Sequence, residues 1–453
     1  MGGRRIATAK LHNTRPSSPP LPRQPECEAR QVLLKEALAA AVQAVQPANC
    51  LAGVLHRLPV EGRTVVIAVG KAATAMAAAA QSILGDGIEG LVLTRYGHGG
   101  GIVLPPSFEI IEAAHPVPDA RGEAAAGRVL ALARGLRAED RLIVLISGGG
   151  SALLALPATG ISLADKQAVN RALLASGATV SEMNCVRKHL SAIKGGRLAL
   201  AAAPARIETY CISDVAGDDP AVIASGPTVP DAATLEEARA VLARYAINPP
   251  AAVLTALADP RNALPPPDHP AFAGAVVQVV ARPLDALAEA ARIVAAHGYE
   301  AVILGDSIEG EAASLGAAHA ALALGYRARS GRHALISGGE CTVRLKGPGG
   351  EGGPNGEYLL ALALGLASCP GVFALAADTD GIDGNGDNAG AVIDPSTLAR
   401  ARAVGLDLAE ALASNRSYEA FAALGDLVTT GPTLTNVNDL RIILVDGAKG
   451  SPR

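Results

Sequence analysis

The stretch RLIVLISGGGS, residues 141–151, predicts the fold of the first half of the chain. Residues 141–146 are apolar after Arg141, which is typical of a strand buried on both faces of a parallel sheet. The loop that follows consists of Ser147, Gly148, Gly149, Gly150 and Ser151. Glycines leave backbone N–H groups accessible to a phosphate, and the N-terminus of the next helical segment would add partial positive charge. We therefore expect an anion-binding loop; a tight turn without a ligand is the alternative.

Apolar strands alternate with helices on both sides of this stretch. Before the proline-rich residues 246–270, strands are expected at 63–69, 89–94, 109–112, 141–146 and 207–213. Beyond the prolines, strands are expected at 275–280, 300–304, 332–336, 372–376 and 440–445, and one helix at 397–413. This alternation predicts an α/β chain with two α/β domains, residues 27–250 and 251–453. The first is predicted to be Rossmann-like, with a doubly wound, mainly parallel sheet.

Composition excludes several functional classes. The formal net charge of −4 offers no basic excess for nucleic acid, and no uninterrupted apolar run reaches the roughly 18 residues of a membrane span.

The six cysteines have no CxxC spacing, which favours free thiols in a reducing, cytoplasmic compartment. Residues 1–26 are basic and proline-rich, and we predict a disordered extension, with an organelle transit segment as the alternative. A monomer and a homodimer both remain open.

Two charged residues follow predicted strands directly. Lys71 comes after strand 63–69, and Asp214 comes after strand 207–213. Ligands of doubly wound sheets bind beyond the carboxyl ends of the strands. A lysine there suits a phosphate, and a carboxylate there accepts a hydroxyl proton or holds Mg²⁺. The alternatives are a solvated lysine at a helix start and an acidic loop that caps a helix.

A basic segment and an acidic loop add further candidates. Arg187 and Lys194 are seven residues apart in an expected helix 179–202, so they would share a face that suits a carboxylate or phosphates. The loop 378–388 contains Asp378, Asp380 and Asp383, whose oxygens suit Mg²⁺. A solvated helix and a structural turn are the respective alternatives. The loop lacks the glycine and the glutamate of an EF-hand.

The string LISGG occurs twice, at 145–149 and at 335–339. Gly338, Gly339 and Glu340 therefore form a second candidate anion-binding turn, although chance similarity is the alternative. The loop at 147–151 matches neither a Walker P-loop nor a GxGxxG dinucleotide motif, because the last glycine of the latter is replaced by Leu153.

Several longer strings occur in one order along the chain. They are VGKAA (69–73), HPVPD (115–119), SGGGSALL (147–154), VRKHLSAIKGGRLA (186–199), SDVAGDDPAVIASGPTVPD (213–231), SGGE (337–340) and DTDGIDGNGDNAGA (378–391). In this order they resemble the type-2 glycerate kinases, whose C-terminal part is the MOFRL domain, here about residues 331–445. The resemblance implies transfer of phosphate from ATP, with Mg²⁺, to the C2 hydroxyl of D-glycerate, giving 2-phospho-D-glycerate in a cleft between the domains.

The resemblance implies a role for two of the candidate residues, Lys71 and Asp214, and the residue patterns described above predict the roles of the others. Lys71 and Asp214 match the catalytic pair, and Arg187 and Lys194 would bind substrate. ATP and its phosphates would contact Ser147, Gly148, Gly149, Gly150, Ser151, Gly338, Gly339 and Glu340. The metal ligands would be Asp378, Asp380 and Asp383.

One string departs from the family. Residues 352–357 read GGPNGE where the family has GGRNQE, so Pro354 and Gly356 replace an arginine and a glutamine. If the arginine of the family contacts phosphate or glycerate, Arg344 or Lys346 is expected to replace it; the alternatives are a slower enzyme and a different acceptor. Two alternative functions stay open: an NAD(P)H-dependent hydroxypyruvate reductase, and a non-catalytic protein that binds a metabolite.

Overall fold

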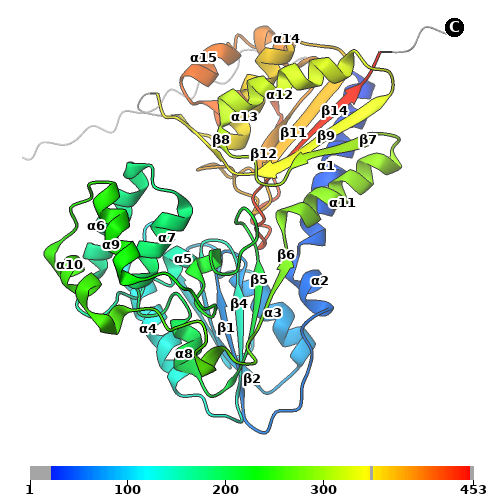
Figure 1. Ribbon diagram of the computed structural model, residues 1–453. Helices are drawn as coiled ribbons and strands as arrows, with labels where there is room; N and C mark the ends of the chain where they lie inside the picture. The colour runs from blue at the N-terminus through cyan, green and yellow to red at the C-terminus, as the bar shows by residue number, and fades with distance from the viewer. Residues whose placement is uncertain (1–21, 347–349, 449–453) are drawn as a thin grey trace, which may run out of the picture.

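A computed structural model describes residues 22–346 and 350–448. It contains two six-stranded sheets, one in each half of the chain (Figure 1). The first sheet is parallel throughout and has the order β3-β2-β1-β4-β5-β6. Its strands are β1 (Thr64–Val69), β2 (Ile88–Arg95), β3 (Phe108–Ala113), β4 (Arg141–Ile146), β5 (Arg206–Ile212) and β6 (Val276–Ala281). The strand order reverses between β1 and β4, which is where doubly wound sheets bind ligands.

Helices cover both faces of this sheet, which explains why β1 and β4 are buried along their whole length and are apolar after their first residue. On β1, Val66 and Ala68 pack in the core with α3 (Ala73–Leu84), whereas Val65, Ile67 and Val69 pack in the core with α4 (Ala120–Arg134) and α8 (Arg197–Ala202). The predicted α/β class and the Rossmann-like parallel sheet are confirmed.

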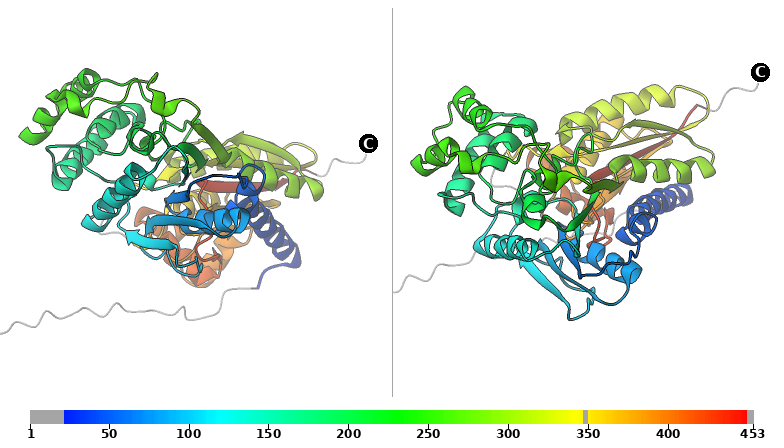
Figure 2. Two further views of the ribbon diagram at one scale, coloured as in Figure 1. Left: turned by 90° about the horizontal axis from the view of Figure 1, so that it is seen from below. Right: turned by 60° about the horizontal axis from the view of Figure 1, so that its bottom comes forward.

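Four helices form a separate group with a small core of its own. They are α6 (Leu163–Ser176), α7 (Val180–His189), α9 (Leu235–Arg244) and α10 (Ala251–Ala258). Figures 1 and 2 show this helical group on the opposite side of the molecule from α1 and α11. The predicted single helix 179–202 is wrong: α7 ends at His189, and a turn that contains Gly195 and Gly196, both at positive φ, precedes α8.

The second sheet is mixed and has the order β13-β12-β11-β14-β9-β7. Its strands are β7 (Glu300–Gly305), β9 (Arg332–Gly339), β11 (Val372–Asp378), β12 (Gly390–Ile393), β13 (Leu427–Val428) and β14 (Asp439–Asp446). Only β7 and β9 pair in parallel within this sheet. One face packs against α12 (Ala312–Arg327) and α13 (Pro354–Leu366), and the other against α1 (Pro25–Ala44) and α11 (Pro283–Ala296).

Smaller helices complete the second half. They are α14 (Thr397–Ala403), α15 (Leu408–Ala413) and α16 (Ser417–Leu424). The predicted single helix 397–413 is therefore two helices, separated at Gly405, whose φ is +74°. None of the helices in the described residues combines the length and the apolarity that a membrane span requires.

The pairing of strands divides the chain differently from the predicted boundary at residue 250. Strand β6 lies beyond that residue but pairs with β5 of the first sheet, while α1, near the start of the chain, packs against α11. We therefore propose that the second domain consists of α1 and the chain from α11 onward. The predicted disordered extension 1–26 lies outside the described residues up to residue 21, and α1 begins at Pro25.

Candidate functional site

The loops that follow β1 and β4 are joined by hydrogen bonds. The N–H of Lys71 donates to the carbonyl of Gly148 at 2.8 Å, and the N–H of Ala72 donates to Oγ of Ser147 at 3.0 Å. Gly70 has a φ of +123°, and a Cβ there would lie 2.3 Å from Oγ of Ser147. The close approach of the two loops places Lys71 beside the glycine loop, as the sequence predicts for strand ends.

The glycine loop is built for close contact with its neighbours. Gly149 has a φ of +82°, and a Cβ on Gly148 would lie 2.1 Å from Oδ2 of Asp214. The loop therefore brings backbone against the Asp214 carboxylate. The helix that follows, α5 (Gly150–Leu153), has four residues, so the helix-end charge expected from the sequence is small.

Lys71 and Asp380 connect the two halves of the chain. Nζ of Lys71 donates to Oδ2 of Asp380 at 2.7 Å, and Asp380 follows β11 of the second sheet. Burial alone would lower the pKa of Lys71, but the charges of Asp380, Asp378 and Asp214 raise it above its ordinary value. Lys71 is therefore a fixed positive charge at neutral pH.

Two asparagines, which no local sequence pattern marks as candidates, form hydrogen bonds to Asp214. Oδ2 of Asp214 accepts from Nδ2 of Asn436 at 3.2 Å, and its backbone carbonyl accepts from Nδ2 of Asn438 at 2.7 Å. Burial raises the pKa of Asp214, and the charge of Lys71 opposes that rise. A carboxylate with a raised pKa and a fixed orientation is suited to accept a proton from a hydroxyl.

The acids of the loop 378–388 do not form a single cluster. The N–H of Asp380 donates to Oδ1 of Asp378 at 2.8 Å, so these two acids are neighbours. Asp383 instead caps α13 and accepts from the N–H of Asn355 at 3.0 Å and of Gly356 at 2.9 Å. Burial raises the pKa of Asp383 to about 7. Within residues 22–346 and 350–448, no three His, Cys, Asp or Glu side chains are arranged to hold a metal.

The three predicted metal ligands are thus not brought together. Burial raises the pKa of Asp378 well above its ordinary value, with the neighbouring Asp380 adding to the rise. Burial acts in the same direction on Asp380, but the charge of Lys71 prevails and lowers the pKa of Asp380. Two carboxylates together with substrate phosphates are a common way to hold Mg²⁺, so Asp378 and Asp380 fit that ion in chemical type.

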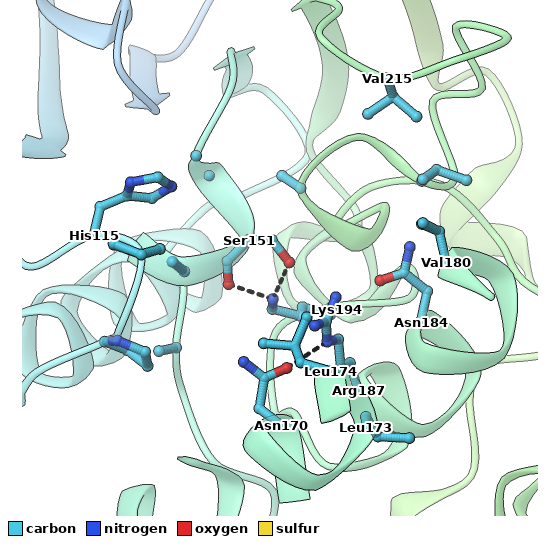
Figure 3. Close-up of a pocket in the computed structure, with 18 of the residues that line it drawn as sticks. His115, Ser151, Asn170, Leu173, Leu174, Val180, Asn184, Arg187, Lys194 and Val215 are labelled. Atoms are coloured by element: carbon cyan, nitrogen blue, oxygen red, sulfur yellow. Dashed lines mark hydrogen bonds between the residues drawn. The ribbon is translucent and has the colours of Figure 1, made fainter. Parts of the chain in front are cut away.

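A cavity of about 570 Å³ lies beside the glycine loop (Figure 3). Gly149, Gly150, Ser151 and Asp214 line one side, and α6 and α7 line the other. Glu309 and Glu340 of the second half also line it. The cavity therefore joins the predicted phosphate loop, the predicted basic residues and residues from both halves of the chain.

Three basic side chains face this cavity. Nζ of Lys194 donates to the carbonyl (2.5 Å) and Oγ (2.7 Å) of Ser151, and Nε of Arg187 donates to Oδ1 of Asn170 at 2.6 Å. The third, Lys166, donates from Nζ to the carbonyl of Leu190 at 2.9 Å. Arg187 and Lys194 do meet at one site, although the reason is not a shared helical face, because Lys194 comes from the turn after α7.

Burial lowers the pKa values of the two lysines, Lys166 and Lys194. It lowers the pKa of Lys194 well below its ordinary value and that of Lys166 to about 7, and the neighbouring cations add to both effects. Lys166 was not predicted from the sequence, because its helix shows no other feature of a binding site.

His115 is a second residue that sequence reasoning left without a role, although it lies in the HPVPD string. A Cβ on Gly149 would lie 3.1 Å from its Nε2, so the ring packs directly against the glycine loop. Burial lowers the pKa of His115 to about 4, and the charge of Lys71 adds to this effect. The imidazole is therefore neutral at the cavity wall.

The second LISGG string has a different structure from the first. Gly338 and Gly339 are the last residues of β9 and pair with β14, and a Cβ on Gly339 would lie 2.3 Å from the nitrogen of Ile308. Nη1 of Arg441 holds the carbonyl of Gly338 at 3.0 Å. These glycines allow close packing of the backbone. Of the three residues predicted here, Gly338, Gly339 and Glu340, it is Glu340 that lines the cavity.

The GGPNGE string starts α13. Pro354 is the first residue of that helix, a position that suits proline, and a Cβ on Gly356 would lie 2.6 Å from Oγ of Ser417. Arg344 and Lys346, the expected substitute cations, are exposed, and neither lines the cavity.

Comparison with known proteins assigns the family. A family model described as a domain of unknown function, DUF4147, matches residues 33–258, and the MOFRL family model matches residues 333–439. A protein of Agrobacterium vitis with the provisional name hydroxypyruvate reductase is 50% identical over 85% of this chain and 100% of its own length. The D-glycerate 2-kinase of Thermotoga maritima is 40% identical over 92% of this chain and 99% of its own.

A solved structure agrees with these matches. The crystal structure of a glycerate kinase from Thermotoga maritima has a TM-score of 0.81 at 38% identity, and the match covers 92% of this chain and all of that one. The chain therefore belongs to the glycerate kinase family with a C-terminal MOFRL domain, and it is a kinase.

Proposed function

We propose that the chain transfers the γ-phosphoryl group of ATP to the C2 hydroxyl of D-glycerate and releases 2-phospho-D-glycerate and ADP. The observation that carries this proposal is that Lys71 and Asp214 both contact the glycine loop, and that Asp214 and this loop line one cavity. Phosphoryl transfer depends mainly on positioning and on neutralising charge, and these groups offer both.

Each residue has a proposed part in the reaction. The backbone of Ser147–Ser151 and the ammonium of Lys71 hold phosphate oxygens, and Asp214 accepts the proton of the C2 hydroxyl as that oxygen attacks phosphorus. Arg187 or Lys194 pairs with the carboxylate of glycerate. Mg²⁺ bound by Asp378 and Asp380 with ATP would neutralise phosphate charge. We propose a cytoplasmic enzyme, with its site between the two domains.

The test is an assay of ADP release. ATP with D-glycerate is expected to give ADP in equal amount to phosphorylated product, and L-glycerate is expected to give far less. Turnover of neither enantiomer, in a preparation that binds ATP, would contradict the proposal and favour a non-catalytic binding protein.

The hydroxypyruvate reductase remains the second candidate for one structural reason. The order β3-β2-β1-β4-β5-β6 is also that of dinucleotide-binding folds. The turn after β1 nevertheless reads VGKAA and lacks the glycines that bring backbone to a pyrophosphate. Oxidation of NADH or NADPH by hydroxypyruvate, without any ADP release from ATP and D-glycerate, would support the reductase.

The glycine loop yields a separate prediction. In Gly148→Ala the new methyl group would occupy the position of the Asp214 carboxylate, so that side chain must turn away. We expect kcat with D-glycerate to fall by about a hundredfold, because a displacement of about 1 Å at a reacting group has that effect. Gly53→Ala is the matched control, because a Cβ on Gly53 meets no atom within 4 Å. Equal kcat values for the two variants would contradict the packing argument.

A further inference from the structure

The cavity beside the glycine loop has an apolar end that the proposed chemistry leaves unexplained. Leu173 and Leu174 of α6 and Val180 of α7 line this end. Figure 3 shows His115 at one side of the cavity, Val180 and Leu173 at the other, and Lys194 and Arg187 between them. Leu174 is 61% exposed and Val180 is 52% exposed, so both present apolar surface to the solvent at this end.

Glycerate cannot account for this apolar end. The molecule has three carbons, two hydroxyls and a carboxylate, so it has no apolar surface to bury. Hydroxyls placed against leucine and valine would lose hydrogen bonds with water and gain none. A volume of about 570 Å³ is also typical of sites for much larger ligands.

The charges between the two ends indicate what the larger ligand carries. Lys166, Arg187 and Lys194 all line the cavity, and none forms an ion pair with a carboxylate in the part of the chain that the structure describes. One glycerate carboxylate requires one of these cations. The other two basic groups would pair with phosphate oxygens, because a nearby anion favours the charged form of a buried lysine and offsets the lowering of its pKa by burial.

The side-chain amides of two asparagines favour a ligand that carries hydrogen-bond acceptors. Oδ1 of Asn170 accepts from Arg187, and Oδ1 of Asn184 accepts from Oγ of Ser225 at 3.3 Å. Neither Nδ2 group has a hydrogen-bond partner among the described residues, and both side chains line the cavity. The amide NH₂ groups are therefore available to ring nitrogens of a base.

We propose that the apolar end between α6 and α7, formed by Leu173, Leu174 and Val180, binds the purine ring of ATP. The inference rests on the proposed kinase function. The ring packs on the aliphatic side chains, Asn170 and Asn184 donate to its nitrogens, and the phosphates extend past the cations to the glycine loop.

The test uses nearly isosteric, uncharged substitutions at exposed positions, which leave the charge of the site unchanged. In the double variant Leu174→Asn/Val180→Thr, we expect the Kd for ADP and the KM for ATP to rise about tenfold or more. Inhibition by inorganic tripolyphosphate and the KM for D-glycerate are expected to stay unchanged. Leu254→Asn on α10 is the matched control, because Leu254 is 51% exposed and lies outside the cavity.

Each other outcome has a definite meaning. An unchanged Kd for ADP would overturn the inference, and a raised KM for D-glycerate alone would assign the apolar end to the acceptor. Equal weakening of ADP and tripolyphosphate would also overturn it, because the effect would then lie at the phosphates. A wild-type protein that binds ADP through this end but does not phosphorylate D-glycerate would contradict the proposed function and support the base site.

Discussion

Lys71→Ala is expected to reduce kcat with ATP and D-glycerate by about a thousandfold. Lys71 is the positive charge at the end of β1, beside the glycine loop, and its pKa is raised, so it is charged throughout the working pH range. The variant loses the neutralisation of charge on the transferred phosphoryl group. Steady-state kinetics with both substrates, together with a thermal unfolding curve, measure the effect.

Two further variants keep this prediction testable. Lys35→Ala is the matched control, because Lys35 is an exposed lysine on α1, and it should leave kcat unchanged. Lys71→Arg keeps the charge but alters its geometry, and we expect an intermediate loss with a normal unfolding temperature. A folded Lys71→Ala variant with more than a tenth of normal kcat would show that Lys71 has no catalytic part.

Asp214→Asn is expected to reduce kcat by about a hundredfold to a thousandfold. Asparagine has almost the same shape and can still accept the hydrogen bond from Asn436, so the change removes basicity and little else. The control is Asp219→Asn, because Asp219 is an exposed acid of the same loop that caps the N–H of Ala221.

The pH profile separates a base from a merely structural carboxylate. Burial raises the pKa of Asp214 above the ordinary value, and a general base acts only when deprotonated. Activity of the natural protein should therefore be lost as the pH falls through this raised pKa, and be full above it. The slope should be absent from the residual activity of Asp214→Asn. An unchanged slope in that variant would assign the titration to another group.

The sequence predicted those parts of the fold that depend on local patterns. After their first residues, Thr64 and Arg141, β1 and β4 are apolar because both sheet faces are covered, and such runs are recognisable in isolation. Helix 179–202 was wrong because the charged pattern continues through Gly195 and Gly196, whose positive φ values end the helix. The proline-rich segment near residue 250 did not mark the change of sheet, because β6 comes after it.

Candidate site residues could be predicted where they directly follow a strand. Residues that reach the site only through tertiary contacts could not be predicted. Lys71 and Asp214 could be selected as candidates because both follow strands of the parallel sheet. Asn436 and Asn438 were missed because they reach Asp214 only through the packing of the two halves, which leaves no local pattern. The repeated LISGG string shows the converse, since identical residues form an open loop after β4 and a paired strand end in β9.

The identity of the product distinguishes phosphorylation at the C2 hydroxyl from every other reaction. The natural protein is incubated with ATP, Mg²⁺ and D-glycerate, and the product is examined by ³¹P NMR with coupling to protons. The account predicts a phosphorus signal coupled to the single proton on C2, which identifies 2-phospho-D-glycerate. Coupling to the two protons on C3, or no phosphorylated glycerate at all, would contradict it.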